Sequence, residues 1–216
     1  MKIVGGEARG RRIDAPVGRD TRPTGEKVRE AVFSMLGGSM NGDDVLDVFG
    51  GSGALGLESI SRGASSAVII DSSRKAASVI ARNIAALGYS DRATVICRPW
   101  RAAFGEIAGR KFSVVFLDPP YKNVDEYSAV SEALISGDML RNGAVLVMEY
   151  ARGVQLSGLP QALMPLKPHN YGDTCVTLYR YVLKPDGAAD RDANRDANGN
   201  ADVESDRLTE DNNIIQ

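Results

Sequence analysis

The chain has 216 residues, of which 43% are hydrophobic and 25% are charged, an ordinary balance for one globular domain with a sizeable core. Its first residues, MKIVGGEARGRR, contain no apolar run long enough for a signal peptide or a membrane span, so we expect a cytoplasmic protein that does not associate with membranes. Cys97, Cys175 and the single histidine, His169, offer no spacing suited to metal ligands, and no metal site is expected.

The charges are distributed unevenly along the chain. Residues 1–36 carry eight Lys or Arg against five Asp or Glu, whereas residues 184–216 carry four against nine. The C-terminal stretch also lacks aromatic residues, which predicts an acidic, disordered tail. We therefore predict a basic N-terminal extension over residues 1–36, a central domain over 37–183 and the tail over 184–216.

The N-terminal extension is predicted to form a β-hairpin around GGEARGRR, followed by a helix. In GEKVREAVFSML, apolar residues recur at the i, i+3, i+4 and i+7 spacing of one helical face. Thr24 is a suitable N-cap for this helix.

Strands and helices alternate through the central domain. Apolar runs predict strands at residues 45–49, 67–71, 94–97, 112–117 and 144–149. The clearest helix covers residues 73–88 and ends at Gly88. Strand-helix alternation predicts an α/β fold, a doubly wound, mostly parallel sheet, with residues 162–183 adding an antiparallel hairpin at its edge.

A glycine-rich loop follows the first of these strands. In VLDVFGGSGALGLE, Gly51, Gly53 and Gly56 satisfy the G-x-G-x-x-G pattern of nucleotide-binding loops. Asp71, at the end of the next predicted strand, is placed to hold ribose hydroxyls, which fits NAD as well as other nucleotides. Asp47, however, would repel a pyrophosphate and suits a cationic ligand.

A second motif, DPPY, follows the strand at residues 112–117. Pro119 and Pro120 end that strand because neither has an N–H group for the sheet, which places Asp118 at the strand's carboxyl end. Ligands of open α/β sheets bind at this edge. Asp47, Asp71 and Asp118 together favour a cationic cofactor that contains ribose, and S-adenosylmethionine has both properties. A structural turn with helix-capping acids is the alternative interpretation.

The glycine loop and DPPY together resemble class I adenosylmethionine-dependent methyltransferases that act on exocyclic amino groups. IVGGEARGRRI, TRPTGEKVREAVFSML, SGALGLESISRGA and YGDT more narrowly resemble the bacterial RsmD family, the 16S rRNA (guanine-N2)-methyltransferases, over about residues 1–183. The resemblance implies a seven-stranded Rossmann-like sheet and methylation of guanine(966) in small-subunit rRNA, free or in a particle, by a monomer.

The resemblance and the motifs together give a set of candidate site residues. Asp118 and the Pro119 carbonyl are predicted to accept hydrogen bonds from the target amino group, with Pro120 holding the loop rigid and Tyr121 stacking on the base. The predicted cofactor-binding residues are Asp47, Phe49, Gly50, Gly51, Ser52, Gly53, Asp71, Ser72, Pro99 and Trp100. Pro99 stands where the family usually has a polar residue, so backbone groups, with Trp100 or Arg98, are expected to line the adenine pocket.

The RNA contacts are predicted in the basic extension. Phosphate contacts are expected from Arg9, Arg11, Arg12, Arg22 and Arg29. A solvated basic face is the alternative, and Arg22 is also placed to pair with Glu30. Glu149, at the end of the fifth predicted strand, either reads N1–H of the guanine or is a solvated acid, and the second interpretation is favoured.

Three rival functions share some of these features. A DNA or RNA methyltransferase acting on adenine N6 or cytosine N4 uses the same motif, but usually carries a separate recognition region for which 216 residues leave little room. An NAD-dependent oxidoreductase would explain the glycine loop alone. A non-enzymatic RNA-binding module would explain the basic extension alone.

Overall fold

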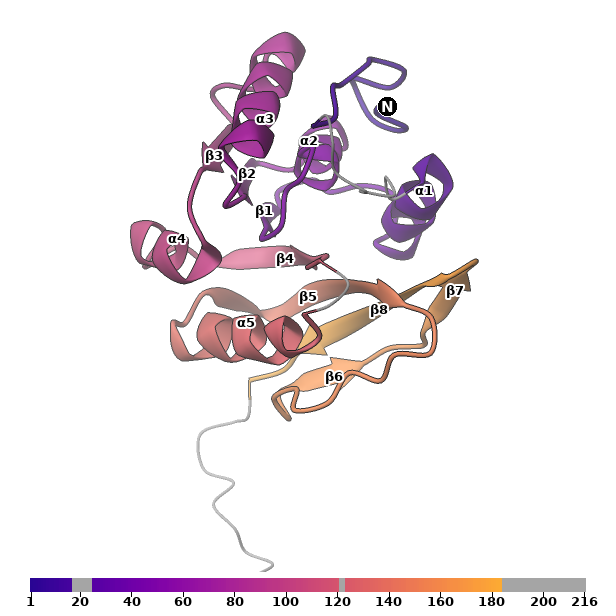
Figure 1. Cartoon of the computed structure of the whole chain (residues 1–216), viewed down its shortest axis with the longest axis vertical. Coiled ribbons are helices and arrows are strands. Elements are labelled where there is room, and N and C mark those ends of the chain that lie inside the picture. The colour runs from indigo at the N-terminus through magenta and orange to yellow at the C-terminus, as the bar shows by residue number, and fades with distance from the viewer. Residues whose placement is uncertain (17–24, 121–122, 184–216) are drawn as a thin grey trace, which may run out of the picture. The chain divides into compact units, whose positions relative to one another are not determined.

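The computed structural model describes residues 1–16, 25–120 and 123–183. The predicted N-cap Thr24 and the predicted site residues Arg22 and Tyr121 lie outside these ranges, as does the predicted tail over residues 184–216. The described residues build one eight-stranded sheet with helices on both of its faces (Figure 1).

Five parallel strands form the centre of the sheet, in the order β3-β2-β1-β4-β5. Their bounds are β1 Asp44–Asp47, β2 Ser66–Ile70, β3 Ala93–Ile96, β4 Phe112–Leu117 and β5 Leu140–Ala151. The order reverses between β1 and β4, which is the position where open α/β sheets bind ligands at the carboxyl ends of their strands. The predicted doubly wound, mostly parallel α/β fold is thereby confirmed.

The sheet ends in antiparallel strands, as expected, but it has eight strands and not seven. β8 (Thr174–Tyr181) pairs with β5 on one side, and with β6 (Leu163–Pro165) and β7 (His169–Tyr171) on the other. The segment between β6 and β7 contains Pro168, which has no N–H group to donate to β8. The expected hairpin therefore contains two short strands beside β8: β6 lies within the predicted partner strand at 162–168, and β7 lies in the segment that was predicted to connect the hairpin.

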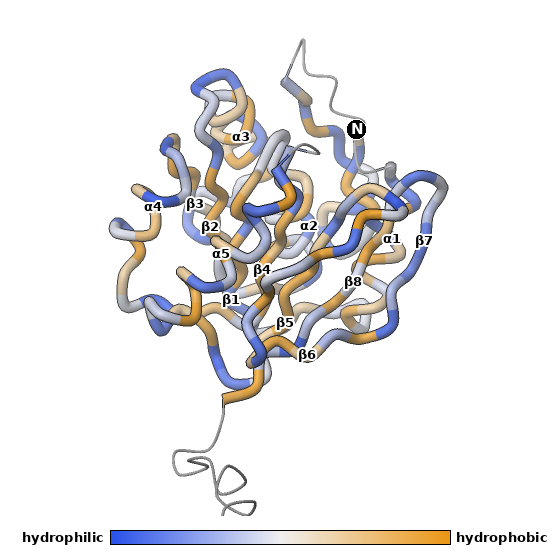
Figure 2. The backbone as a smooth tube through the Cα atoms, turned by 60° about the horizontal axis from the view of Figure 1, so that its bottom comes forward, coloured by the Kyte–Doolittle hydropathy of each residue, from blue (hydrophilic) through white to orange (hydrophobic). Residues whose placement is uncertain are grey.

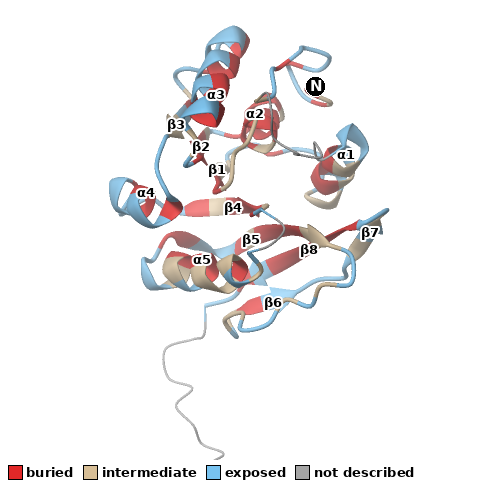
Figure 3. Ribbon diagram, viewed as in Figure 1, coloured by how far each residue is buried: buried red, intermediate tan, exposed pale blue. Residues whose placement is uncertain are grey.

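The helices separate into two layers, each with its own hydrophobic core. Helices α1 (Glu26–Met35), α2 (Ala54–Ser61) and α3 (Arg74–Leu87) cover one face, and α4 (Trp100–Glu106) and α5 (Asp125–Ser136) cover the other. Hydrophobic residues concentrate along the central strands (Figure 2), and the strands are buried more completely than the helices, whose outer sides are exposed (Figure 3). Within the described ranges, none of the helices has the length and apolar character that a membrane crossing requires.

The N-terminal residues form a loop closed by one antiparallel bridge between Lys2 and Arg12. Ser61, the last residue of α2, holds this loop, because its hydroxyl accepts from the Ala8 N–H at 2.9 Å and donates to the Gly5 carbonyl at 2.6 Å. Since α2 runs from the carboxyl ends of the parallel strands back to their amino ends, the loop lies at the amino edge of the sheet.

Candidate active site

Four carboxylates lie at the carboxyl ends of four adjacent strands, on the same face of the sheet. Two positions before each carboxylate, the same strand has a hydrophobic residue that belongs to the core under α1, α2 and α3. Since side chains two positions apart in a strand point to the same face, the carboxylates lie on the face that these helices cover. The carboxylates are Asp71 after β2, Asp47 in β1, Asp118 after β4 and Glu149 in β5, and the core residues are Ile69, Val45, Phe116 and Val147. At about 4.8 Å between strands, the row spans about 14 Å.

Two of these carboxylates brace the glycine loop. Asp71 accepts from the backbone N–H of Gly51 at 2.9 Å and from that of Ser73, the N-cap of α3, at 2.8 Å. Asp47 accepts from the N–H of Gly56 in α2 at 3.3 Å. Both predicted cofactor-binding acids therefore also position the loop.

The glycine loop fits closely against β2. A Cβ on Gly50 would lie 2.4 Å from the Ile69 side chain, and Gly53 begins α2 with a φ of 78°, a conformation that favours glycine. Ile69 thus fills the space that a methyl group at position 50 would need.

Burial and mutual repulsion make the ionised forms of Asp47 and Asp118 unfavourable in this row. Burial raises the pKa of Asp47 to about 7, and the nearby charge of Asp71 adds to the rise that its backbone hydrogen bonds oppose. Burial likewise raises the pKa of Asp118, with further contributions from the charges of Glu149 and Asp47. A ligand that brings positive charge to this row relieves both effects.

The DPPY segment is described as far as Pro120. Asp118 is half-buried and Pro119 is buried, while Pro120 is exposed and its carbonyl accepts from the Asn123 N–H at 2.9 Å. Helix α5 then begins at Asp125, and the Tyr127 hydroxyl donates to the Glu149 carbonyl in β5. The segment is thus anchored at both of its described ends.

The predicted adenine pocket divides between the two faces of the sheet. Pro99 is exposed and caps α4, whereas the Trp100 indole is buried in the core under α4 and α5. Its Nε1–H donates to Glu126 at 2.6 Å, and the Arg101 guanidinium lies 4.2 Å from its ring centroid. Trp100 therefore lies away from the face of the four carboxylates, and its contact with a cofactor stays a prediction.

Of the other predicted cofactor residues, Phe49 is half-buried and packs against that same opposite core, Ser52 is half-buried in the glycine loop, and Ser72 is exposed beside Asp71.

The structure does not support Arg29 as an RNA contact. Its side chain is fully buried and pairs with Glu58 of α2 at 3.0 Å, so no phosphate can reach it. The same glutamate accepts from the Val4 N–H and pairs with Arg62. This network joins α1, α2 and the N-terminal loop.

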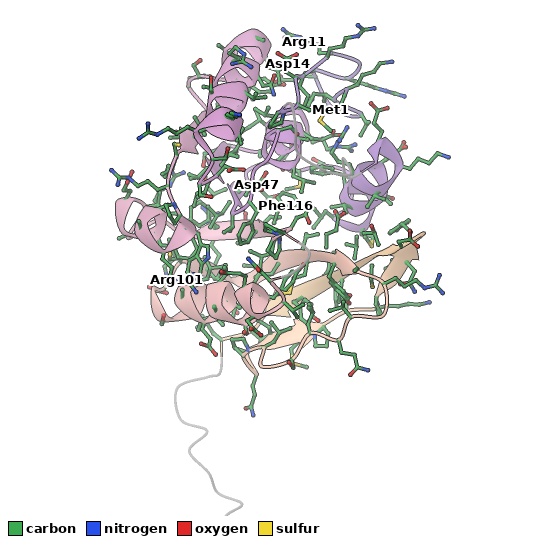
Figure 4. The ribbon with its side chains drawn as sticks, in the orientation of Figure 1. Met1, Arg11, Asp14, Asp47, Arg101 and Phe116 are labelled. Atoms are coloured by element: carbon green, nitrogen blue, oxygen red, sulfur yellow. The ribbon has the colours of Figure 1, made fainter. Side chains whose placement is uncertain are left out.

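Arg9, Arg11 and Arg12 are exposed, but they lie at the amino edge of the sheet. Arg11 donates to the Leu87 and Ala86 carbonyls at the C-terminal end of α3, where a cation is favourable. Because α3 has 14 residues, this end is about 21 Å from its start beside Asp71. Figure 4 shows Arg11 beside α3 and Asp47 near Phe116, well apart from each other.

Asn83 was not anticipated from the sequence. Its amide donates to the carbonyls of Ser52, in the glycine loop, and of Asp14, both at 3.0 Å, and its oxygen accepts from the Asp14 N–H. Asn83 is buried within the apolar face of α3. A polar residue within an otherwise apolar helical face indicates a buried hydrogen-bonding role, so the position of Asn83 in the sequence could have identified it.

In the part of the chain that the structure describes, no three His, Cys, Asp or Glu residues are grouped so as to hold a metal ion.

Comparison with known proteins places nearly all of the described region in one family. A family described as "Conserved hypothetical protein 95" matches residues 1–180. The chain is 34% identical over 182 residues to the Bacillus subtilis (strain 168) protein named "Putative rRNA methyltransferase YlbH", covering 83% of this chain and 98% of that one. It is 35% identical over 122 residues to "Ribosomal RNA small subunit methyltransferase D" of Escherichia coli (strain K12), covering 56% of this chain and 61% of that one.

A solved structure agrees with these sequence relatives. The structure titled "Putative methyltransferase yhhF from Escherichia coli" superimposes with a TM-score of 0.74 at 28% identity, covering 85% of this chain and 99% of that one. Because these relatives are named methyltransferases, the oxidoreductase and the non-enzymatic binding module lose their support.

Proposed function

The chain belongs to the RsmD family of ribosomal RNA small-subunit methyltransferases, and from that premise we propose that it methylates the exocyclic N2 of a guanine in this RNA, using S-adenosylmethionine. The observation that carries the proposal is the row of four carboxylates on adjacent strands, with Asp118 directly before Pro119 and Pro120.

The carboxylate row fits S-adenosylmethionine on two counts. The buried carboxylates favour a ligand that carries positive charge, because burial and mutual repulsion raise the pKa values of Asp47 and Asp118. Asp71, at the end of β2, is placed to accept from ribose hydroxyls. Ser72 and the segment around Pro99 are exposed at the ends of β2 and β3, along the same edge. When bound, the cofactor supplies a methyl group activated by its sulfonium charge.

The protein's own contribution is to make guanine N2 a better nucleophile. The lone pair of this amino group is delocalised into the ring. Asp118 and the Pro119 carbonyl each accept one N–H bond, which directs the lone pair towards the methyl group and stabilises the positive charge that develops on nitrogen. Two consecutive prolines keep the carbonyl in place. Tyr121 provides a face on which the extruded base stacks.

The family resemblance, and not the geometry of the site, points to guanine(966). The substrate is small-subunit rRNA, either free or assembled in the particle, and the enzyme acts as a monomer.

The proposal is tested by incubating the protein with methyl-labelled S-adenosylmethionine and small-subunit rRNA that lacks the modification, both free and in particles. Digestion of the RNA should release labelled N2-methylguanosine, and mapping should place it at position 966. Glu132→Gln, an exposed carboxylate on α5, is the matched control and should behave as wild type.

Labelled N6-methyladenosine or N4-methylcytosine would instead support the rival amino-methyltransferase. Absence of label in every RNA tested would contradict the proposal. NAD should not raise the melting temperature, whereas S-adenosylmethionine and its demethylated product should.

A further inference from the structure

We propose that Glu149 selects guanine by accepting a hydrogen bond from N1–H of the base whose N2 faces Asp118; the inference rests on the proposed function and deepens it. Nothing in the reaction itself requires this residue, since Asp118 and Pro119 already accept both N2 hydrogens. The residue would decide which base enters the site.

The position of Glu149 brings it beside Asp118. The last registered pair between β4 and β5 is Leu117 with Met148, so Asp118 and Glu149 are the next residues along two neighbouring strands. Their side chains share the face covered by α1, α2 and α3, as the positions of Phe116 and Val147 establish. The Glu149 charge is also close enough to raise the pKa of Asp118.

Glu149 is not the solvated strand-end acid that its sequence position suggested. Its exposed fraction is 7%, and β5 continues beyond it to Ala151. A buried carboxylate next to another carboxylate is unfavourable for folding, which points to a role in ligand recognition.

The backbone at Glu149 is held from two sides. Its carbonyl accepts from the Tyr127 hydroxyl of α5, and the residue pairs with Val176 of β8, which is fully buried. A backbone fixed in this way gives the carboxylate a constant point of attachment, which reduces how far it can adjust to suit a second base.

The chemistry of the base edges explains the selection. Guanine presents N1–H and the N2 amino group as neighbouring donors, and two neighbouring carboxylates complement them. Adenine presents an acceptor at N1, whose lone pair would face the Glu149 carboxylate. A buried acceptor left without a donor, and opposed by another acceptor, disfavours that base strongly.

The test uses bases that keep the reactive amino group and change only the recognition edge. Small-subunit rRNA is prepared with guanine, 2-aminopurine or 2,6-diaminopurine at the methylated position; both analogues retain the 2-amino group but have an acceptor at N1. Wild-type kcat/KM should be at least about 100-fold higher for guanine than for either analogue.

In Glu149→Gln, the preference for guanine should fall to within about tenfold, because a carboxamide can donate to N1 as well as accept from it. Affinity for S-adenosylmethionine should not change. Glu149→Asp keeps the charge, but its shorter side chain holds the carboxylate farther from the base, so transfer to guanine should fall without a gain for the analogues. The control Glu132→Gln should retain the wild-type preference.

Equal rates on guanine and the analogues in the wild type, or an unchanged preference in a folded Glu149→Gln, would overturn the inference. Failure of the wild type to methylate guanine at all would instead overturn the proposed function, so the two failures are distinguishable.

Discussion

Among single residues, Asp118 should contribute most to methyl transfer. Asp118→Ala should lower methyl transfer by about 100-fold or more, because an acceptor that acts on the developing charge is lost. Asp118→Asn keeps an acceptor oxygen and should be affected less. Affinity for S-adenosylmethionine, measured by calorimetry, should fall much less than methyl transfer in both variants, and wild-type turnover in the alanine variant would contradict the two-acceptor arrangement.

The raised pKa of Asp47 predicts how the stability of the ligand-free protein depends on pH. Because burial raises its pKa to about 7, the ligand-free folded protein retains a proton there that the unfolded chain releases near the ordinary value of 3.8. The folded state thus binds more protons between these values, and stability should fall as pH rises from about 4 to about 7.

Over the same pH window, affinity for S-adenosylmethionine should rise by up to about tenfold per pH unit, because the positive ligand favours the ionised carboxylate. Asp118 adds to the trend in the same direction. Asp47→Asn should therefore reduce the slope between pH 5 and 7 without abolishing it. Calorimetric titrations that give the same slope in wild type and variant would exclude Asp47 from the charge at the cofactor.

Single residues also show where sequence reading reaches its limit. The motifs located Asp47, Asp71 and Asp118 because each follows a strong apolar run. Arg29 and Glu149 were misjudged, because charge alone does not reveal that a helix buries one against Glu58 or that a strand continues past the other. Burial depends on partners that are distant in the sequence.

Among the elements, the attachment of α1 to α2 depends on a buried ion pair. Glu58 accepts from Arg29 and Arg62 and from the Val4 N–H, and its side chain is fully buried. Glu58→Ala would leave the Arg29 guanidinium buried without its counter-charge, and should lower the free energy of unfolding by about 3–5 kcal/mol.

Urea denaturation measures this loss. Glu30→Gln, which changes an exposed glutamate on α1, is the control and should stay within about 0.5 kcal/mol of wild type. A loss below about 1 kcal/mol for Glu58→Ala would show that the network contributes little to the docking of α1.

The ends of helices and strands were predicted well where residues near in sequence determine them, and poorly where pairing with distant strands does. The strand predicted at residues 112–117 agrees with β4 at both ends, and the helix predicted at 73–88 agrees with α3 to within a residue at each end. β5 is longer than expected at both ends, because it pairs with Phe112 of β4 from Leu140 onward and with β8 as far as Ala151. On its other side, β8 pairs with the two short strands β6 and β7. Pairing across a sheet is not encoded locally.

For the whole molecule, the alternation of strands and helices predicted the class of fold and the edge that carries the site. It did not predict where the N-terminal loop docks. That loop is held by Ser61 and by the end of α3, so its arginines lie at the amino edge, away from the carboxylate row.

We expect Arg11 to differ from Arg9 and Arg12 in its effect on RNA binding. Arg11 is engaged by carbonyls at the end of α3, so Arg11→Ala should lower the melting temperature and leave the salt dependence of RNA binding unchanged. Arg9 and Arg12 are exposed. If RNA extends from the carboxyl edge across the face to these residues, replacing both by Ala should reduce the slope of log affinity against log salt by about 1.4–1.8.

That loss should be the same whichever guanine the RNA offers, because phosphate contacts carry no sequence information, and affinity for S-adenosylmethionine should not change. An unchanged slope in the Arg9/Arg12 double variant, with RNA still methylated, would show that the substrate does not reach the amino edge. The interface would then be confined to the carboxyl edge around Asp118, and the basic excess of the N-terminal extension would need a structural explanation of the kind that Arg11 and Arg29 already have.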